Sequence, residues 1–122
     1  MPRPTVLVVD DEPDLCELRA ITLARMNLES RAAHDLASAR ELLRAENFNL
    51  CLTDMNLPDG NGLSLVEWIQ SNRPDLPVAV ITAHGNVESA VKALKLGAFD
   101  FVSKPLDLGD LRKIVASAIK LR

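Results

Sequence analysis

The sequence predicts an α/β fold in which helices cover both faces of a parallel sheet. Three observations support this fold class: short apolar, β-branched runs recur along the chain, amphipathic stretches lie between them, and Gly and Pro residues mark the connections. Strands that alternate with helices join into parallel sheets through right-handed crossovers. Apolar runs without polar alternation are typical of strands that are buried on both faces.

Five strands and five helices follow from these patterns. Four strands are apolar runs, at residues 5–9, 50–53, 78–82 and 99–102. A more polar strand at residues 29–33 follows a helix expected at about residues 14–26. Four further helices are indicated by apolar residues three or four positions apart, which share one helical face. These stripes are Leu36, Ala39 and Leu43; Leu65, Trp68 and Ile69; Val87, Val91 and Leu94; and Leu108, Leu111 and Val115.

Size and composition indicate one globular domain. The chain has 122 residues, of which 48% are hydrophobic and 25% are charged, which is typical of a folded protein with a single core. The net charge is −3 and the Lys and Arg residues are scattered, so we expect no direct nucleic-acid partner. No apolar run approaches the roughly 20 residues that span a bilayer. We expect a cytoplasmic protein, with Cys16 and Cys51 as free thiols.

Polar residues follow most of the predicted strands at the point where each strand ends. Asp10 and Asp11 follow the first strand, Asp54 the third and Lys104 the fifth, while Thr82 ends the fourth. In open parallel sheets, ligands bind beyond these carboxyl ends, where the strand order reverses. Each residue also has a purely structural explanation. The aspartates could cap helices or form turns, Thr82 could be an ordinary strand residue, and Lys104 could be a solvated charge.

Taken together, the three carboxylates indicate a metal site. Carboxylates on one edge repel one another unless a proton, a metal cation or an ammonium group compensates them. Lys104 supplies one positive charge, and oxygen ligands without His or Cys favour Mg²⁺. A carboxylate beside Mg²⁺ can attack a phosphoryl group and form an aspartyl phosphate. The collected residues therefore match the needs of such a reaction.

Four segments occur in order along the chain: VVDDEP at residues 8–13, LTDMNLPDG at 52–60, ITA at 81–83 and GAFDFVSKP at 97–105. Through these segments, and over nearly its whole length, the chain resembles the receiver domains of bacterial two-component response regulators. The resemblance implies a flavodoxin-like, doubly wound sheet of five parallel strands in the order 2-1-3-4-5, with five helices. Residues 1–122 would form one receiver domain, and excision from a longer regulator is compatible with this.

The resemblance also implies how the acidic residues act. Asp54 would accept the phosphoryl group from a sensor histidine kinase. Asp11, Asp54 and the backbone carbonyl of Asn56 would bind Mg²⁺, while Asp10 would lie in the same pocket and reach the metal partly through water. The domain would assist its own phosphorylation and dephosphorylation but would not be an enzyme.

Further roles in switching follow from the same resemblance. Thr82 and Lys104 would contact phosphoryl oxygens, and the bond between Lys104 and Pro105 would be cis. Phe101 would change rotamer on phosphorylation, although an aromatic residue here could equally be part of the core.

Residues 82–85 and 97–101 are most similar to receivers of the NtrC type, which precede an ATPase domain and a DNA-binding domain in transcription activators. Phosphorylation would change the surface formed by the fourth helix, the fifth strand and the last helix. We expect a phosphorylation-dependent homodimer through Val87, Val91 and Leu94, although this stripe could instead be core.

Two other functions remain open. A Mg²⁺-dependent aspartyl-phosphate phosphatase of the haloacid dehalogenase kind uses a similar nucleophile, but it carries Asp where this chain has Asn56. Such an enzyme would turn over phosphate esters, whereas a receiver takes up at most one phosphoryl group per chain. A phosphorylation-independent interaction module would show no Mg²⁺-dependent labelling, and the complete set of acidic residues argues against it.

Overall fold

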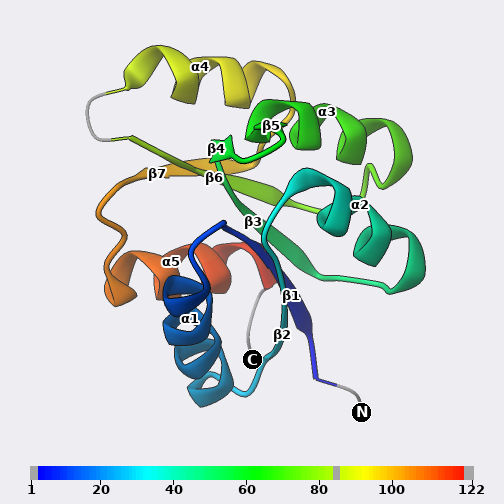
Figure 1. Ribbon diagram of the computed structural model, residues 1–122. Helices are drawn as coiled ribbons and strands as arrows, with labels where there is room; N and C mark the ends of the chain where they lie inside the picture. Colours follow the sequence, from blue (N-terminus) through cyan, green and yellow to red (C-terminus); the bar gives the residue numbers. More distant parts are fainter. Residues whose placement is uncertain (1–2, 84–85, 120–122) are drawn as a thin grey trace.

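The computed structural model describes the whole chain except residues 1–2, 84–85 and 120–122, and its centre is a five-stranded sheet (Figure 1). All neighbouring strands are parallel, and the order is β2-β1-β3-β6-β7. This confirms the predicted order 2-1-3-4-5. His84 and Gly85, in a segment compared with the NtrC type, lie outside the described residues. The strands are β1 (Thr5–Val9), β2 (Glu29–Ala33), β3 (Leu50–Asp54), β6 (Val78–Thr82) and β7 (Asp100–Ser103).

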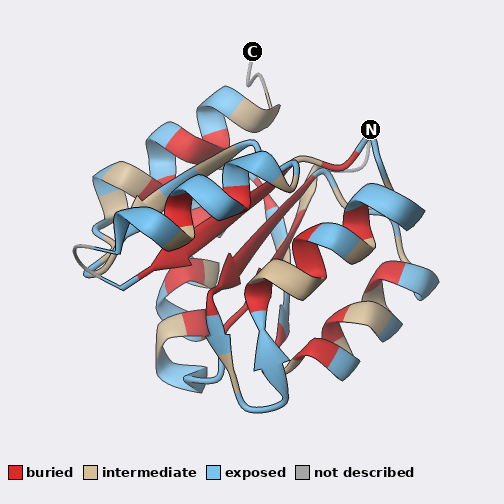
Figure 2. Ribbon diagram, turned by 90° about the horizontal axis from the view of Figure 1, so that it is seen from above, coloured by how far each residue is buried: buried red, intermediate tan, exposed pale blue. Residues whose placement is uncertain are grey.

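Helices cover both faces of the sheet, as expected for a doubly wound fold (Figure 1). Side chains alternate between the two faces along each strand, so Leu7 and Val9 belong to one core and Val6 and Val8 to the other. Figure 2 shows the buried strands at the centre of the molecule. One face carries α1 (Pro13–Arg25) and α5 (Leu108–Ile119), and the other carries α2 (Leu36–Ala45), α3 (Gly62–Asn72) and α4 (Val87–Lys95).

The last strand differs from the sequence-based expectation. Every residue of β3 and β6 is buried, but β7 alternates between half-buried and exposed residues. The interpretation of residues 99–102 as a strand buried on both faces was therefore wrong. The reason is its position, because β7 lies at the edge of the sheet with β6 as its single neighbour.

The apolar stripe of α4 also faces away from the core. Val87, Val91 and Leu94 are exposed, whereas Ala90 and Ala93 are the buried residues of this helix. The alternative that this stripe is core is therefore wrong. Alanine has a short side chain, so α4 packs close to the sheet and its larger apolar residues are left at the surface.

A short hairpin follows β3, where the sequence indicated only turns. It consists of the antiparallel strands β4 (Asn56–Leu57) and β5 (Gly60–Asn61). Asp59, between these strands, accepts hydrogen bonds from the backbone N–H groups of Leu36 at 2.8 Å and Ala37 at 3.1 Å. A carboxylate at a helix N-terminus satisfies free N–H groups and complements the helix dipole, so the hairpin is attached to α2.

Cys16 and Cys51 are buried free thiols, as expected, and burial raises the pKa of Cys51 to about 12. Among the helices that the structure describes, none is both long and apolar enough to cross a bilayer.

Gly62 permits the close return of the chain from the hairpin to the end of β3. Its N–H donates to the carbonyl of Met55 at 2.7 Å. A Cβ atom at this position would lie 2.3 Å from the carbonyl oxygen of Asp54, far inside van der Waals contact. The three nearest atoms are all backbone atoms of Asp54 and Met55, which have little freedom to move, so only glycine fits here without a shift of the chain.

We predict that Gly62→Ala lowers the free energy of unfolding by about 1–3 kcal/mol, the usual cost of overpacking. Urea unfolding monitored by circular dichroism measures this. Gly109→Ala is the matched control, because its Cβ would meet only a side-chain atom, Asp107 Oδ1 at 3.2 Å. Equal stability of the two variants would contradict the packing argument.

Candidate functional site

The three predicted carboxylates lie together at the carboxyl ends of β1 and β3. Asp10 follows β1 and Asp54 ends β3, on the two sides of the point where the strand order reverses. Each of Asp10, Asp11 and Asp54 offers one oxygen to a group whose atoms all lie within 4.8 Å of one another. Asp10 and Asp54 are only 1% and 2% exposed, whereas Asp11 is open to solvent. The group is therefore accessible from the side of Asp11.

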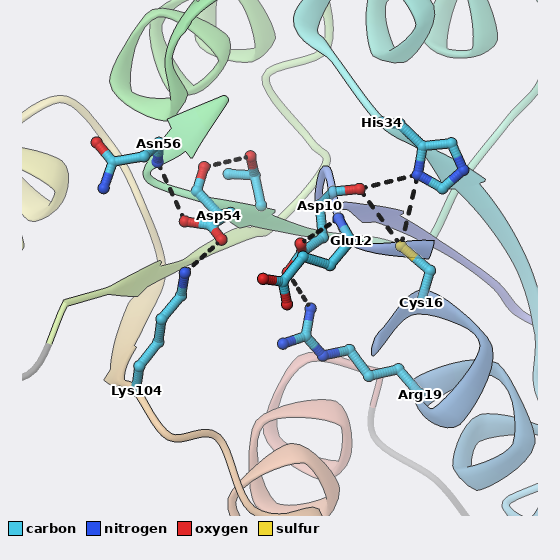
Figure 3. A network of polar contacts seen from close by, with 9 residues as sticks. Asp10, Glu12, Cys16, Arg19, His34, Asp54, Asn56 and Lys104 are labelled. Carbon is cyan, nitrogen blue, oxygen red and sulfur yellow. Dashed lines mark hydrogen bonds and ion pairs between the residues drawn. The ribbon is translucent and has the colours of Figure 1, made fainter. Parts of the chain in front are cut away.

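Two cations from distant parts of the chain compensate these carboxylates (Figure 3). Lys104 Nζ lies 2.6 Å from Asp54 Oδ2, and Arg19 Nη1 lies 2.7 Å from Asp10 Oδ2. Because Asp11 has no comparable partner among the ion pairs of the described residues, the group keeps an excess of negative charge. Such a group attracts a further cation.

Lys104 is held as an ammonium ion. Partial burial acts to lower its pKa, but the hydrogen bond and charge of Asp54, with the charges of Asp10 and Glu12, outweigh this and raise the pKa above its ordinary value of 10.5. The contribution of this ion pair to stability is therefore fully present below the ordinary pKa and is lost only as the pH rises through the raised value. Lys104 is charged throughout the physiological range.

Both oxygens of Asp54 have hydrogen-bond partners. Oδ2 accepts from Lys104, and Oδ1 accepts from the backbone N–H of Asn56 at 3.1 Å. The backbone of the following residue, Met55, donates to Ile81 in β6 at 3.0 Å. The orientation of the Asp54 carboxylate is thus set by β3, by the hairpin and by the segment after β7.

Thr82 ends β6, next to β3, and Phe101 lies on the edge strand β7. The Thr82 hydroxyl is buried and donates to the carbonyl of Val102 at 3.4 Å, a long hydrogen bond. The Thr82 carbonyl accepts from the N–H of Lys104 at 2.8 Å, and the Lys104–Pro105 bond is cis, as expected. Phe101 is 37% exposed, so the alternative that it is a core residue is wrong.

Sequence reasoning missed two residues around Asp10. Arg19 is buried on the same face of α1 as Cys16 and Leu23, and a charged residue at core spacing was the signal that could have revealed it. In the tautomer that carries its proton on Nδ1, His34 donates from this nitrogen to the Asp10 carbonyl at 2.9 Å. The Cys16 thiol donates to the same oxygen at 3.5 Å. His34 comes from the connection after β2, and its sequence context contained no comparable signal.

The donor atoms of this group suit a hard divalent cation. All are carboxylate oxygens, Asp11 is exposed enough to leave room for water, and the excess charge is negative. Mg²⁺ prefers such a set, binding one or two carboxylates and keeping several waters that phosphate oxygens can replace. The group could therefore hold a metal ion next to the Asp54 carboxylate, which is itself a potential nucleophile.

The sequence is similar to the sequences of known response regulators. Residues 6–116 match the response regulator receiver domain family. The chain is 58% identical to the response regulator protein PilR of Pseudomonas aeruginosa over 122 residues, which are 100% of this chain and 27% of that protein. It is 33% identical to the transcriptional regulator NtrC of Proteus hauseri over 119 residues, which are 98% of this chain and 25% of that protein. The chain thus spans a minor part of each relative.

Solved structures of receiver domains have the same fold as this chain. The receiver domain of NtrX from Brucella abortus has a TM-score of 0.88 at 36% identity, with 96% of this chain and 99% of that chain covered. The beryllofluoride-activated NtrC4 receiver domain dimer has a TM-score of 0.89 at 34% identity, with 95% and 96% covered. Since the family match extends over most of the chain and the sheet order agrees with it, this protein belongs to the receiver domains of two-component response regulators, of the type found in NtrC-like transcription activators.

Proposed function

We propose that this domain is a phosphorylation-dependent switch that accepts a phosphoryl group on Asp54 from a sensor histidine kinase in the presence of Mg²⁺. The environment of Asp54 carries the proposal. This almost fully buried carboxylate belongs to the acidic group within 4.8 Å and lies 2.6 Å from the ammonium group of Lys104. A nucleophile, a place for a cation and a fixed positive charge are the requirements of phosphoryl transfer to a carboxylate.

The residues divide the chemistry between them. An Asp54 oxygen forms the new O–P bond while the bond from phosphorus to the donor breaks. When bound by Asp10, Asp11, Asp54 and the Asn56 carbonyl, Mg²⁺ would offset negative charge on the transferred group. Lys104, already paired with Asp54, would move its hydrogen bond to a phosphoryl oxygen and balance part of the added charge.

Thr82 and Phe101 would convert this reaction into a conformational change. The Thr82 hydroxyl makes only a long hydrogen bond, 3.4 Å to Val102, and a phosphoryl oxygen is a stronger acceptor. We infer that the hydroxyl turns toward the phosphoryl group and that Phe101, exposed on the adjacent strand, turns into the space it leaves. A phosphoryl group shifts this equilibrium only by its different affinity for the two states, so the unphosphorylated domain should already sample the active state.

The surface beside Phe101 is the proposed output. Val87, Val91 and Leu94 on α4 are exposed, together with Phe99 and Phe101 near β7. An apolar patch of this kind is typical of an interaction site. The similar NtrC4 receiver forms a dimer in its activated state, which supports a phosphorylation-dependent homodimer here. By the same analogy, the switch would control ATPase and DNA-binding domains and thereby transcription.

The two alternative functions have less support. For a phosphatase of the haloacid dehalogenase kind, Asn56 offers an amide where an acid is needed, and its N–H already contacts Asp54. For a phosphorylation-independent interaction module, nothing would require Asp54 and Lys104 to be paired beside two further carboxylates.

The first prediction from this proposed function tests the acceptor. Wild-type protein incubated with acetyl phosphate and Mg²⁺ should gain the mass of one phosphoryl group, and chelation of Mg²⁺ should prevent this. Asp54→Asn should gain none, because an amide has nearly the same shape but is not a nucleophile. Intact-protein mass spectrometry measures the mass, and Asp59→Asn is the control carboxylate. Undiminished labelling of Asp54→Asn would eliminate Asp54 as the acceptor.

A second prediction concerns Lys104. Lys104→Ala should be labelled more slowly, by on the order of 100-fold, which is the usual effect of removing one preorganised donor. The same mass assay followed over time measures the rate, and Lys92→Ala removes an exposed charge as a control. Labelling of Lys104→Ala at the wild-type rate would reject the proposed role of its ammonium group.

A third prediction links Thr82 to dimerisation. Beryllofluoride with Mg²⁺ should shift wild-type protein toward a dimer in sedimentation velocity, and Thr82→Ala should respond less because it lacks the hydroxyl. Val91→Asp should also reduce association, because it places a charge on the apolar patch. If beryllofluoride leaves wild type monomeric, or affects Thr82→Ala equally, the coupling is absent.

A further inference from the structure

Arg19 is the most deeply buried cation next to the acidic group. Its side chain is 7% exposed, whereas the side chain of Lys104 is 41% exposed. Its Nη1 lies 2.7 Å from Asp10 Oδ2, while Asp10 Oδ1 accepts from the N–H of Glu12 at 2.9 Å (Figure 3). Arginine stays protonated in proteins, so this buried positive charge is permanent.

We propose that Arg19 is a positioning residue that acts through Asp10 as an internal counterion and weakens Mg²⁺ binding. This inference rests on the proposed magnesium role of the acidic group. In the metal-free protein, the guanidinium compensates a buried carboxylate and holds its orientation. When Mg²⁺ binds, the same carboxylate is shared by two cations that repel each other.

Asp10 lies between Arg19 and the proposed metal site, so it brings the guanidinium group and Mg²⁺ close together. Asp10 contacts Arg19 directly and contributes an oxygen to the group whose atoms lie within 4.8 Å. A metal ion held by this group is therefore separated from the guanidinium by one carboxylate. Water screens little of this interaction, since Asp10 is 1% exposed. Lys104 differs, because its partly exposed side chain can move to an incoming phosphoryl group.

Removal of the Arg19 charge should therefore have two effects of opposite sign. Asp10 would become a buried carboxylate without its partner, which destabilises the metal-free domain. Mg²⁺ would then bind more tightly, because it relieves this charge and no longer meets a neighbouring cation. A residue with a merely structural role would lower stability without improving metal binding.

The experiment compares Arg19→Gln with wild type and with Arg25→Gln, a control that removes one exposed charge from the same helix. Isothermal titration calorimetry measures the Kd for Mg²⁺, and thermal unfolding measures Tm with and without Mg²⁺. We expect Arg19→Gln to bind Mg²⁺ about tenfold more tightly, a modest effect for a charge one carboxylate away. Its Tm should be lower without the metal and should rise more than that of wild type when Mg²⁺ is added.

Arg19→Lys keeps the charge and should retain nearly the wild-type Kd. If Arg19→Gln is too unstable for calorimetry, a larger Mg²⁺-dependent gain in Tm still supports the proposal, and an equal or smaller gain overturns it. The role of Arg19 alone would be overturned if Arg19→Gln bound Mg²⁺ with unchanged or weaker affinity. This conclusion requires that wild type binds Mg²⁺ and that Asp11→Ala binds it poorly. If wild type does not bind Mg²⁺, or Asp11→Ala binds it equally well, the proposed metal site itself fails.

Discussion

Three carboxylates crowded at the ends of two adjacent strands are the constraint on which the rest of this site depends. The sheet order places β1 beside β3, so Asp10 and Asp54 must meet at the carboxyl edge. Nearly complete burial would make their charges costly if they were alone. Arg19 from α1 and Lys104 from the segment after β7 provide compensation. The electrostatics of one small group therefore join elements from both ends of the chain.

Hydrogen bonds also connect the acidic group to β7, the strand at one edge of the sheet. Lys104 contacts Asp54 through its ammonium group and the Thr82 carbonyl through its backbone N–H. The Thr82 hydroxyl in turn contacts Val102 on β7, next to exposed Phe101. In the proposed switch, a change of charge at Asp54 would act on this short set of hydrogen bonds. The exposed stripe of α4 borders this edge, which is why we regard it as the output surface.

The backbone that follows Asp54 at the end of β3 is held by two contacts of the hairpin segment. The hairpin after β3 is attached to α2 through Asp59, and the chain returns to the Asp54 carbonyl at Gly62. Both contacts restrict the segment that contains Asn56, whose N–H contacts the Asp54 carboxylate. As the proposed nucleophile, Asp54 would benefit from such support, because it would have to meet a phosphoryl donor in one orientation.

Local patterns were sufficient to predict the alternation of strands and helices and the polar residues at the strand ends, because side-chain periodicity follows from backbone geometry. The strand order came from family resemblance, since no local pattern specifies which strands become neighbours. Only the folded chain decided that β7 exposes alternate residues, that α4 turns Val91 outward and that Arg19 neutralises Asp10. Each of these outcomes depends on which residues, distant in sequence, cover a side chain or lie within reach of its charge. Burial and ion pairing are properties of that three-dimensional neighbourhood and not of the residue itself.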